Sequence, residues 1–177
     1  MERSRIQSRG FSLVEMVVYV SVLIFMLFIL VEVVTSFVRS ERLIRTSRDI
    51  DNSALVSLER IGREVRRANS INVASSTLLS SPGVLVLSGE DGEGNLRMVE
   101  FFLSNSSLRY KENGVDLGPL TSSSTRVTNL VFRRFATSTG SGQGTSISEG
   151  VRVELRLEGG TTTSYKTENF YSTALIR

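Results

Sequence analysis

A short block near the N-terminus holds the residues whose types and spacing suggest chemistry. Gly10 ends a basic leader, residues 1–10, and Phe11 opens a long apolar run that carries Glu15 four positions later. A carboxylate inside a bilayer costs about 2.5–3.5 kcal/mol on insertion scales and usually has a partner. Glu15 is therefore either a group that pairs with a cation or a solvated carboxylate at the membrane edge.

The apolar run has the length of a membrane-spanning helix. Residues 11–38 are 28 positions long, and at a rise of ~1.5 Å each they extend about 42 Å, more than the ~30 Å of a hydrocarbon core. A secretory signal peptide has a shorter core with small residues after it, whereas Glu32, Val33 and Val34 follow here. The plausible peptide cut therefore precedes the run, at Gly10, and the helix stays in the mature chain.

Arginines stand on both sides of this run. The leader contains Arg3, Arg5 and Arg9, which favour a cytoplasmic N-terminus. A second set follows the run at intervals of three and weakens that inference: Arg39, Arg42, Arg45 and Arg48. We interpret the second set as a solvated face at the end of the membrane segment, with lipid head groups or acidic residues of a neighbouring subunit as the alternative.

The segment Arg9-Gly10-Phe11-Ser12-Leu13-Val14-Glu15 resembles the prepilin peptidase site of the type IV pilin family. The resemblance implies cleavage between Gly10 and Phe11, N-methylation of Phe11, and pairing of Glu15 with the Phe11 amine of a neighbouring subunit during assembly. Two opposite charges that are each costly in an apolar filament core cost less as a pair. Unlike many major pilins, the chain has no proline before Pro82, and position 32 is a glutamate, which we read as the end of the bilayer-spanning part.

Composition narrows the possible functions. The chain lacks cysteine and histidine, which excludes disulfides, thiolate nucleophiles, the usual zinc sites and histidine-based acid–base chemistry. No nucleophile–base set is evident, so we expect no enzymatic activity and no cofactor or metal. The net charge is +3, of which the leader supplies +2, so the mature chain is near neutral and we expect no nucleic acid as a partner.

Helical periodicity continues past the apolar run. One face between residues 39 and 69 carries apolar residues at spacings of 4, 3, 4 and 3: Ala54, Leu58, Ile61, Val65 and Ala68. Residues 11–38 and the amphipathic extension, residues 39–69, therefore form one long helix that ends near residue 68.

Residues 70–177 have the pattern of an antiparallel β domain. Strand-forming runs cover residues 84–87, 96–103, 108–111, 127–135, 151–157 and 165–176. Asn113-Gly114 predicts a hairpin, and residues 151–158 alternate strictly between apolar and charged side chains. The fold class is therefore α+β, with a sheet of about six strands whose one face is covered by the C-terminal half of the long helix. This arrangement resembles that of the type IV pilins.

A looser resemblance extends into the second half of the chain. Residues 55–68, the turn at residues 91–95 and the ending at residues 171–177 are similar to the J-type pseudopilins and the related W-type minor pilins. The resemblance implies an inner-membrane precursor with an extracytoplasmic C-terminal domain that later joins a bacterial pilus or pseudopilus. Its partners would be other pilin subunits, the prepilin peptidase, the inner-membrane assembly platform and membrane lipid.

Three other patterns have simpler explanations than a ligand site. Asp91, Glu93 and Asn95 have the alternate spacing of a calcium loop, but Phe102 stands where a bidentate glutamate belongs, which favours a polar turn. Residues 140–144 are glycine-rich but lack the lysine and helix start of a phosphate loop. Residues 132–135 combine phenylalanine with arginine, as some nucleic-acid-binding surfaces do, but a strand with alternating buried and exposed side chains gives the same pattern.

The function expected from the sequence is that of a minor pilin or pseudopilin, a structural subunit of a type II secretion pseudopilus or a type IV pilus. A competence pseudopilus is a further possibility. The main alternative is an uncleaved single-pass anchor that displays an extracytoplasmic ligand-binding β domain. A membrane-tethered hydrolase is disfavoured by the missing histidine and cysteine.

Overall fold

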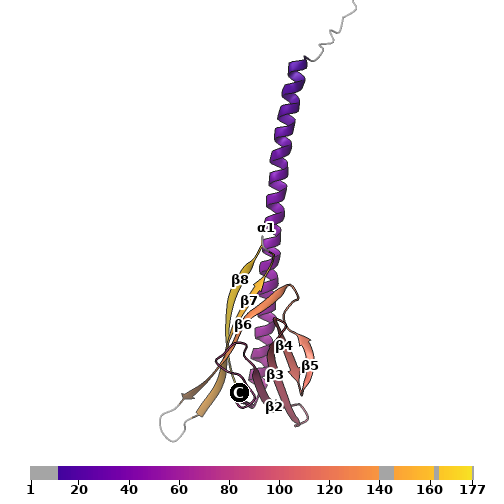
Figure 1. Ribbon diagram of the computed structural model, residues 1–177. Helices are drawn as coiled ribbons and strands as arrows, with labels where there is room; N and C mark the ends of the chain where they lie inside the picture. Colours follow the sequence, from indigo (N-terminus) through magenta and orange to yellow (C-terminus); the bar gives the residue numbers. More distant parts are fainter. Residues whose placement is uncertain (1–11, 140–145, 162–163, 177) are drawn as a thin grey trace, which may run out of the picture. The chain divides into compact units, whose positions relative to one another are not determined.

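The computed structural model describes residues 12–139, 146–161 and 164–176. One long helix precedes eight β-strands (Figure 1). The helix α1, Leu13–Arg67, is continuous, and the prediction of one long helix is confirmed over the described residues. The chain forms two compact units, Met1–Glu41 and Arg42–Arg177, and α1 contributes a segment to each.

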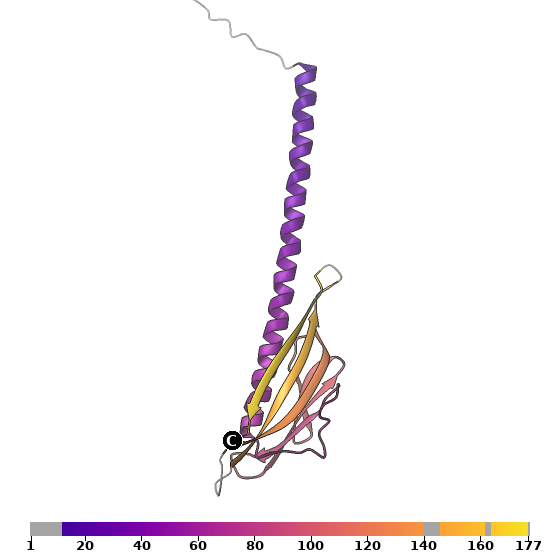
Figure 2. The ribbon, with the colours of Figure 1, turned by 90° about the vertical axis from the view of Figure 1, so that its left-hand side faces the viewer.

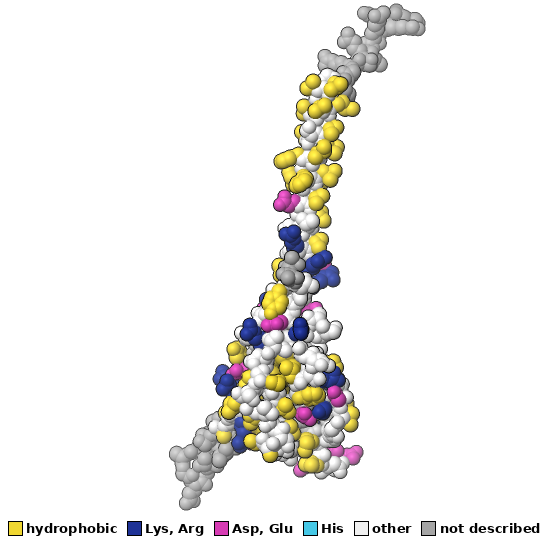
Figure 3. Space-filling model, viewed as in Figure 1, with side chains coloured by type: hydrophobic (Ala, Val, Ile, Leu, Met, Phe, Trp, Pro, Cys, Tyr) yellow, Lys and Arg dark blue, Asp and Glu magenta, His cyan; other side chains and the backbone are white. Residues whose placement is uncertain are grey.

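The α1 segment in the first unit has apolar side chains on its surface. A window within α1 has a mean hydropathy of 2.9, none of it is buried, and the helix is long and apolar enough to cross a membrane. Figure 3 shows these apolar side chains along the exposed N-terminal part of the helix. Phe25 and Phe28, for instance, are 68% and 75% exposed. The described helix therefore supports membrane anchoring through its length and its apolar surface.

The α1 segment in the second unit is amphipathic and covers the sheets. Ala54, Ile61, Val65 and Ala68 of the predicted stripe are buried, while Leu58 is only half-buried. Five buried positions were not predicted: Ile50, Ser53, Ser57, Gly62 and Glu64. The buried face is thus broader than the apolar stripe, because small and paired polar side chains also pack against the strands.

The first sheet has five antiparallel strands in the order β1-β2-β3-β4-β5. Its strands are β1 Ser70–Ile71, β2 Leu85–Glu90, β3 Leu96–Ser104, β4 Ser107–Glu112 and β5 Val115–Pro119. Two tight turns join its last three strands. Asn113 and Gly114 both have positive φ between the paired Glu112 and Val115, which confirms the predicted hairpin. Asn105 and Ser106 make the other turn without a glycine.

The second sheet has three antiparallel strands in the order β6-β7-β8. They are β6 Thr125–Thr139, β7 Ser146–Gly159 and β8 Lys166–Leu175, and Figure 2 shows β8 beside the C-terminal half of α1. The prediction of a single sheet of about six strands is wrong. The reason is that loops and a turn occupy part of the free edge of β6. The Leu79 and Gly83 N–H groups each donate to a β6 carbonyl at 2.9 Å, and the Val127 N–H donates to the Ser106 carbonyl at 2.7 Å.

Both sheets and α1 contribute to one hydrophobic core in the second unit. Its largest fully buried apolar side chains come from every layer: Ile50, Ile61, Leu85, Leu87, Phe101, Leu108, Leu130, Phe132, Leu155 and Leu157. Alternate residues of β7, from Val151 to Leu157, point into this core as the sequence pattern predicted. Strand alternation explains Phe132 and Arg133, because Phe132 is buried while Arg133 Nε lies 2.8 Å from Glu154 Oε1 on the exposed side. It does not explain Arg134, which is exposed as well.

Candidate assembly site and a buried ion-pair cluster

The predicted processing residues, Gly10 and Phe11, lie outside the described residues. The described chain starts at Ser12, directly before α1. Glu15, the predicted assembly residue, lies in the first turn of α1 and is exposed. A carboxylate in the first turn of a helix interacts favourably with the positive end of the helix dipole. The interaction with the helix dipole is thus a local role for Glu15 that does not require a second subunit.

Ser12 caps the start of α1. Its hydroxyl oxygen accepts a hydrogen bond from the Glu15 backbone N–H at 3.2 Å, and its carbonyl accepts one from the Met16 N–H at 3.2 Å. The spacing Ser12-x-x-Glu15 is that of a capping box, a signal that is present in the sequence but was not among the predicted features. An N-cap serine stabilises a helix by about 0.5–2 kcal/mol relative to alanine. The helix therefore begins at the residue after the cap, just past the predicted cleavage site.

The Glu15 carboxylate has no cationic partner within the described part of the chain. The surrounding surface is apolar, since Leu13, Val14 and Val18 are all exposed. Fully burying each such side chain is worth about 1.5–3 kcal/mol. Lipid or another protein must cover this surface, and a cation near Glu15 has to come from another molecule or from the residues before Ser12.

A second carboxylate lies on the same apolar segment. Glu32 belongs to a shallow groove of about 500 Å³ on one face of α1, together with Ile24, Leu27, Phe28, Val31 and Thr35. The Thr35 hydroxyl lies 3.0 Å from the Val31 carbonyl and 2.9 Å from the Glu32 carbonyl, so it donates its proton to the backbone of its own helix. It is therefore not available to neutralise the Glu32 carboxylate.

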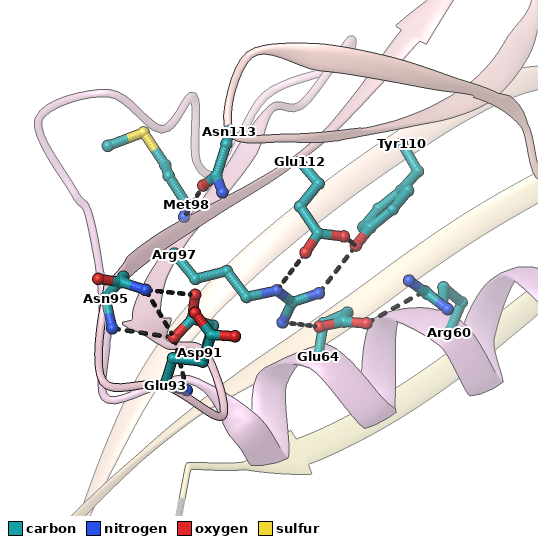
Figure 4. Close-up of polar contacts among 10 residues, drawn as sticks. All are labelled: Arg60, Glu64, Asp91, Glu93, Asn95, Arg97, Met98, Tyr110, Glu112 and Asn113. Carbon is teal, nitrogen blue, oxygen red and sulfur yellow. Dashed lines mark hydrogen bonds and ion pairs between the residues drawn. The ribbon is translucent and has the colours of Figure 1, made fainter.

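Glu64, in the second half of α1, is buried and paired, in contrast to Glu15 and Glu32. Its side chain is 1% exposed, and its two oxygens meet two arginines: Arg97 Nη1 lies 2.6 Å from Oε2, and Arg60 Nε lies 3.1 Å from Oε1 (Figure 4). Arg97 comes from β3 and Arg60 from α1 itself. A buried charge is tolerated only when it is paired and hydrogen-bonded. The sequence gives one signal for this pairing, because Glu64 interrupts the apolar face between Ile61 and Val65.

Arg97 connects Glu64 to two residues of β4. Its Nε donates to Glu112 Oε1 at 2.6 Å and its Nη2 to the Tyr110 hydroxyl at 3.0 Å, while that hydroxyl donates to Glu112 Oε2 at 2.6 Å. The Arg60 guanidinium lies 4.5 Å from the centroid of the Tyr110 ring, a cation–π contact. Figure 4 shows the group as a continuous network between α1 and the first sheet. We call Arg60, Glu64, Arg97, Tyr110 and Glu112 the polar cluster.

The polar cluster shifts the acid–base properties of its members. Hydrogen bonds from Arg97 and then Tyr110 lower the pKa of Glu112 to about 2, and the hydrogen bond to Glu112 raises the pKa of Arg97 above its ordinary value. Burial raises the pKa of Tyr110. All charges in the cluster are matched, and it includes no serine, threonine or lysine that it would activate. Its geometry suits a fixed connection between helix and sheet.

The loop with calcium-like spacing is closed by its own hydrogen bonds. Asp91 Oδ1 accepts from the Glu93 N–H at 2.8 Å and from the Asn95 N–H at 2.9 Å, and Oδ2 accepts from the Asn95 amide at 3.1 Å. The hydrogen bonds from Asn95 are the main reason that the pKa of Asp91 is lowered. This is an Asx turn before β3, as a polar turn predicts. The glycine-rich segment at residues 140–144 lies outside the described residues.

Comparisons with known proteins give no relative for this chain. No protein-family model matches it, and neither a curated protein nor a solved structure matches it significantly. The residues and their geometry are therefore the basis for any function. Two features bear on the function most. One is the exposed apolar part of α1 with its two carboxylates. The other is the second unit, in which the polar cluster connects the C-terminal part of α1 to the first sheet.

Proposed function

We propose that this chain is a minor pilin or pseudopilin, a structural subunit of a type IV filament system. The observation that carries the proposal is the order of features at the N-terminus. A basic leader ends at Gly10, Phe11 and Glu15 follow, and an exposed apolar helix begins at Leu13, directly after the Ser12 cap. Such a helix requires lipid before assembly and other subunits after it.

In this proposal the prepilin peptidase cuts between Gly10 and Phe11, and Phe11 is then N-methylated. The new amine is a cation four residues before Glu15 in the sequence, and Glu15 lies in the first turn of α1. In an apolar filament core, Glu15 of one subunit and the Phe11 amine of its neighbour would neutralise each other. The folded unit from Arg42 onward would lie outside the core and provide the outer surface of the filament.

The proposed setting is a bacterial inner membrane, with the N-terminus in the cytoplasm and the β domain on the other side. The partners are other pilin-like subunits, the prepilin peptidase and the inner-membrane assembly platform. A J-type pseudopilin of type II secretion is the preferred subclass because residues 55–68, 91–95 and 171–177 resemble segments of those proteins. A W-type minor pilin of a type IV pilus comes next, and a competence pseudopilus subunit after that.

Substitutions at Gly10 test the proposed processing. In cells with an active prepilin peptidase, the wild-type protein in the membrane should begin at N-methylated Phe11, as measured by intact mass and N-terminal sequencing. Gly10→Val should block the cut by crowding the scissile bond, whereas Gly10→Ala should be cut like the wild type. A wild-type chain that still begins at Met1 would refute the proposal.

Substitutions at Glu15 and Ser12 separate assembly from helix capping. Glu15→Val should leave cleavage and membrane insertion intact, because it removes a charge from an apolar segment, but should lower the incorporation of the protein into sheared filaments. Ser12→Ala removes the cap and keeps the carboxylate. If both variants reduce incorporation equally, Glu15 acts through the start of the helix and not through a partner.

One observation favours the alternative of an uncleaved anchor with a ligand-binding β domain. A groove of about 370 Å³ runs between α1 and β8, and its wall includes Leu55, Leu58 and Phe170 with Asp51 and Arg66. An apolar groove with a few charges at its border is typical of a binding site. An unprocessed N-terminus together with a monomeric protein in detergent would favour this function.

A further inference from the structure

Three of the four sheet edges in the described part of the chain are protected against pairing with a further strand. β1 has only 2 residues, and β5 has 5, ends at Pro119 and pairs irregularly with β4. Loops and a turn make hydrogen bonds along the edge of β6. Short length, irregular pairing, proline and coverage by other segments are the usual means by which a sheet avoids adding a foreign strand.

The fourth edge, that of β8, is long and regular. β8 has 10 residues and pairs with β7 without a register shift. Its charged residues, Lys166 and Glu168, stand near its start, and the strand contains neither proline nor glycine. The means of protection found at the other three edges are thus not applied to the sequence of this one.

The backbone groups along the β8 edge are free. The Ile176 N–H donates to the Glu149 carbonyl at 2.8 Å, and these two residues continue the register of β7 with β8. Residues of an antiparallel pair alternate between bonding to the neighbouring strand and pointing away from it, so the even-numbered residues of β8 bond to β7. The N–H and C=O groups that point away have no hydrogen-bond partner in the described part of the chain, and they belong to Thr167, Asn169, Tyr171, Thr173 and Leu175.

A groove lies between β8 and α1, which run side by side (Figure 2). Its volume of about 370 Å³ is typical of a ligand site. Its apolar wall includes Leu55, which is 62% exposed, and the half-buried Leu58 and Phe170. In a strand added to β8, every second side chain would point to the α1 side of the sheet. Those side chains would cover the apolar wall while the backbone pairs with β8.

The strand β8 runs in the same direction as α1. Near its start, Lys166 Nζ lies 2.7 Å from Ser47 Oγ. Near its end, Leu175 lines a pocket together with Arg66. The groove between them therefore has a defined polarity along the chain.

Charges of opposite sign stand toward the two ends of the groove. Asp51 and Glu59 border it toward the start of β8, and Arg66 borders it toward the end. Glu59 and Arg66 make no ion pair within the described residues. Asp51 and Arg66 are about 22 Å apart along the helix axis, a distance that about seven residues of a strand span. The groove thus selects a strand with a base at one end and an acid at the other.

We propose that β8 and this groove bind an extended segment of another protein, which adds to the second sheet as a strand antiparallel to β8. Antiparallel pairing is the more stable kind, and backbone pairing with alternate side chains in a groove is a general mode of peptide recognition. The segment carries an acid near its N-terminal end, beside Arg66, and a base near its C-terminal end, beside Asp51 and Glu59. The inference goes beyond the filament function and does not depend on it, since an uncleaved anchor would present the same edge.

A second copy of this chain does not fit the same edge. Antiparallel pairing of two β8 strands would make their α1 helices run in opposite directions, because each β8 runs with its own α1. Two such helices anchored in one membrane from the same side run in the same direction. The bound segment therefore comes from a different protein.

Peptide selection tests whether the edge binds a strand. The full-length protein in lipid nanodiscs is offered a display library of random peptides as long as β8, 10 residues, with empty nanodiscs as the background. Enriched peptides should alternate apolar with polar residues and should carry an acid toward the N-terminal end and a base toward the C-terminal end. No enrichment over empty nanodiscs, or enrichment without alternation, would overturn the inference.

Backbone methylation of an enriched peptide tests the strand pairing. N-methyl groups on the alternate residues whose N–H groups face β8 should weaken binding at least about tenfold in fluorescence anisotropy, because several hydrogen bonds are lost. The same number of N-methyl groups on the intervening residues is the control and should change the affinity less than about threefold. Equal losses for the two sets would mean that the peptide binds without pairing to β8.

Variants at Tyr171 test the edge from the side of the protein. Tyr171→Pro removes an N–H that points away from β7 and should weaken binding of the enriched peptide at least about tenfold. Tyr171→Ala keeps this N–H, and because the Tyr171 side chain is 64% exposed, it should fold and bind like the wild type. If Tyr171→Ala weakens binding as much as Tyr171→Pro, the protein recognises the peptide through a side chain and the proposal fails.

Variants on α1 test the groove without changing β8. Leu55→Ser should weaken binding at least about tenfold, because it removes apolar contact area. Val56→Ser is the matched control, since Val56 is also exposed but lines a different groove, beside Leu117 of β5. Glu59→Arg should favour a peptide in which an acid replaces the C-terminal base. A peptide that binds the Leu55→Ser and wild-type proteins equally would lie outside the groove and refute the proposed site.

Discussion

The two segments of α1 treat a carboxylate on the helix in opposite ways. In the second unit, Glu64 is buried, and Arg60 and Arg97 of the same chain pair with it. In the first unit, Glu15 and Glu32 lie on an exposed apolar segment without such a partner among the described residues. On one continuous helix, the chain itself thus neutralises the glutamate of the second unit, whereas the glutamates of the first unit remain available to another molecule.

The difference follows from what surrounds each segment. Residues from Ile50 onward face two sheets that supply both apolar contacts and cations. The segment before Arg42 has no strand in the described part of its unit, so its apolar side chains remain exposed. Stability of the fold is therefore concentrated in the second unit, while the first unit carries the surface that remains to be covered.

Two truncations should break this comparison most strongly. Removing residues 1–38 should leave a soluble, folded fragment rich in β structure by circular dichroism. Removing residues 1–68 also takes away Ile50, Ile61 and Val65, each worth about 1.5–3 kcal/mol when buried, against a total stability of roughly 5–15 kcal/mol. The shorter fragment should unfold or aggregate. Equal folding of both fragments would show that α1 is not part of the core.

Removing the buried carboxylate should have the next largest effect. In the fragment that lacks residues 1–38, Glu64→Ala leaves Arg97 without its partner on α1 and should lower the free energy of unfolding by about 3–5 kcal/mol. Urea denaturation followed by circular dichroism measures this change. Glu59→Ala, at an exposed position of the same helix, is the matched control and should change stability by less than about 0.5 kcal/mol. A similar small change for Glu64→Ala would mean that the polar cluster does not connect helix and sheet.

Lowering the pH should reduce the free energy of unfolding gradually, and by less than Glu64→Ala does. The pKa of Glu112 is about 2 in the folded protein, against 4.5 as its ordinary value, so unfolding takes up a proton between these two pH values. Its contribution to stability is therefore complete above pH 4.5 and is lost as the pH falls toward 2. Denaturation of wild-type and Glu112→Gln fragments at several pH values should show a difference in stability that shrinks over this window. A difference that stays constant from about pH 6 to about pH 2 would assign the effect of Glu112 to something other than its charge.

The sequence by itself determined the parts of this protein that depend on local pattern. Apolar length and the lack of proline predicted the helix, alternation predicted β7, and Asn113-Gly114 predicted its hairpin, because each of these depends on residues close together in the chain. The chemistry proposed for Gly10, Phe11 and Glu15 also comes from the sequence alone, since the first two lie outside the described residues. The Ser12 cap could have been read from the same block.

Only the tertiary structure decided how distant residues meet. It divided the strands into two sheets, because Leu79, Gly83 and Ser106 take hydrogen-bonding positions along β6 that another strand would need. It also brought Glu64 against Arg97, 33 positions further along the chain. Local periodicity marks Glu64 only as a charge on an apolar face and cannot name its partner. That partner is set by the register of β3 with β4 and by the face of the first sheet that α1 covers.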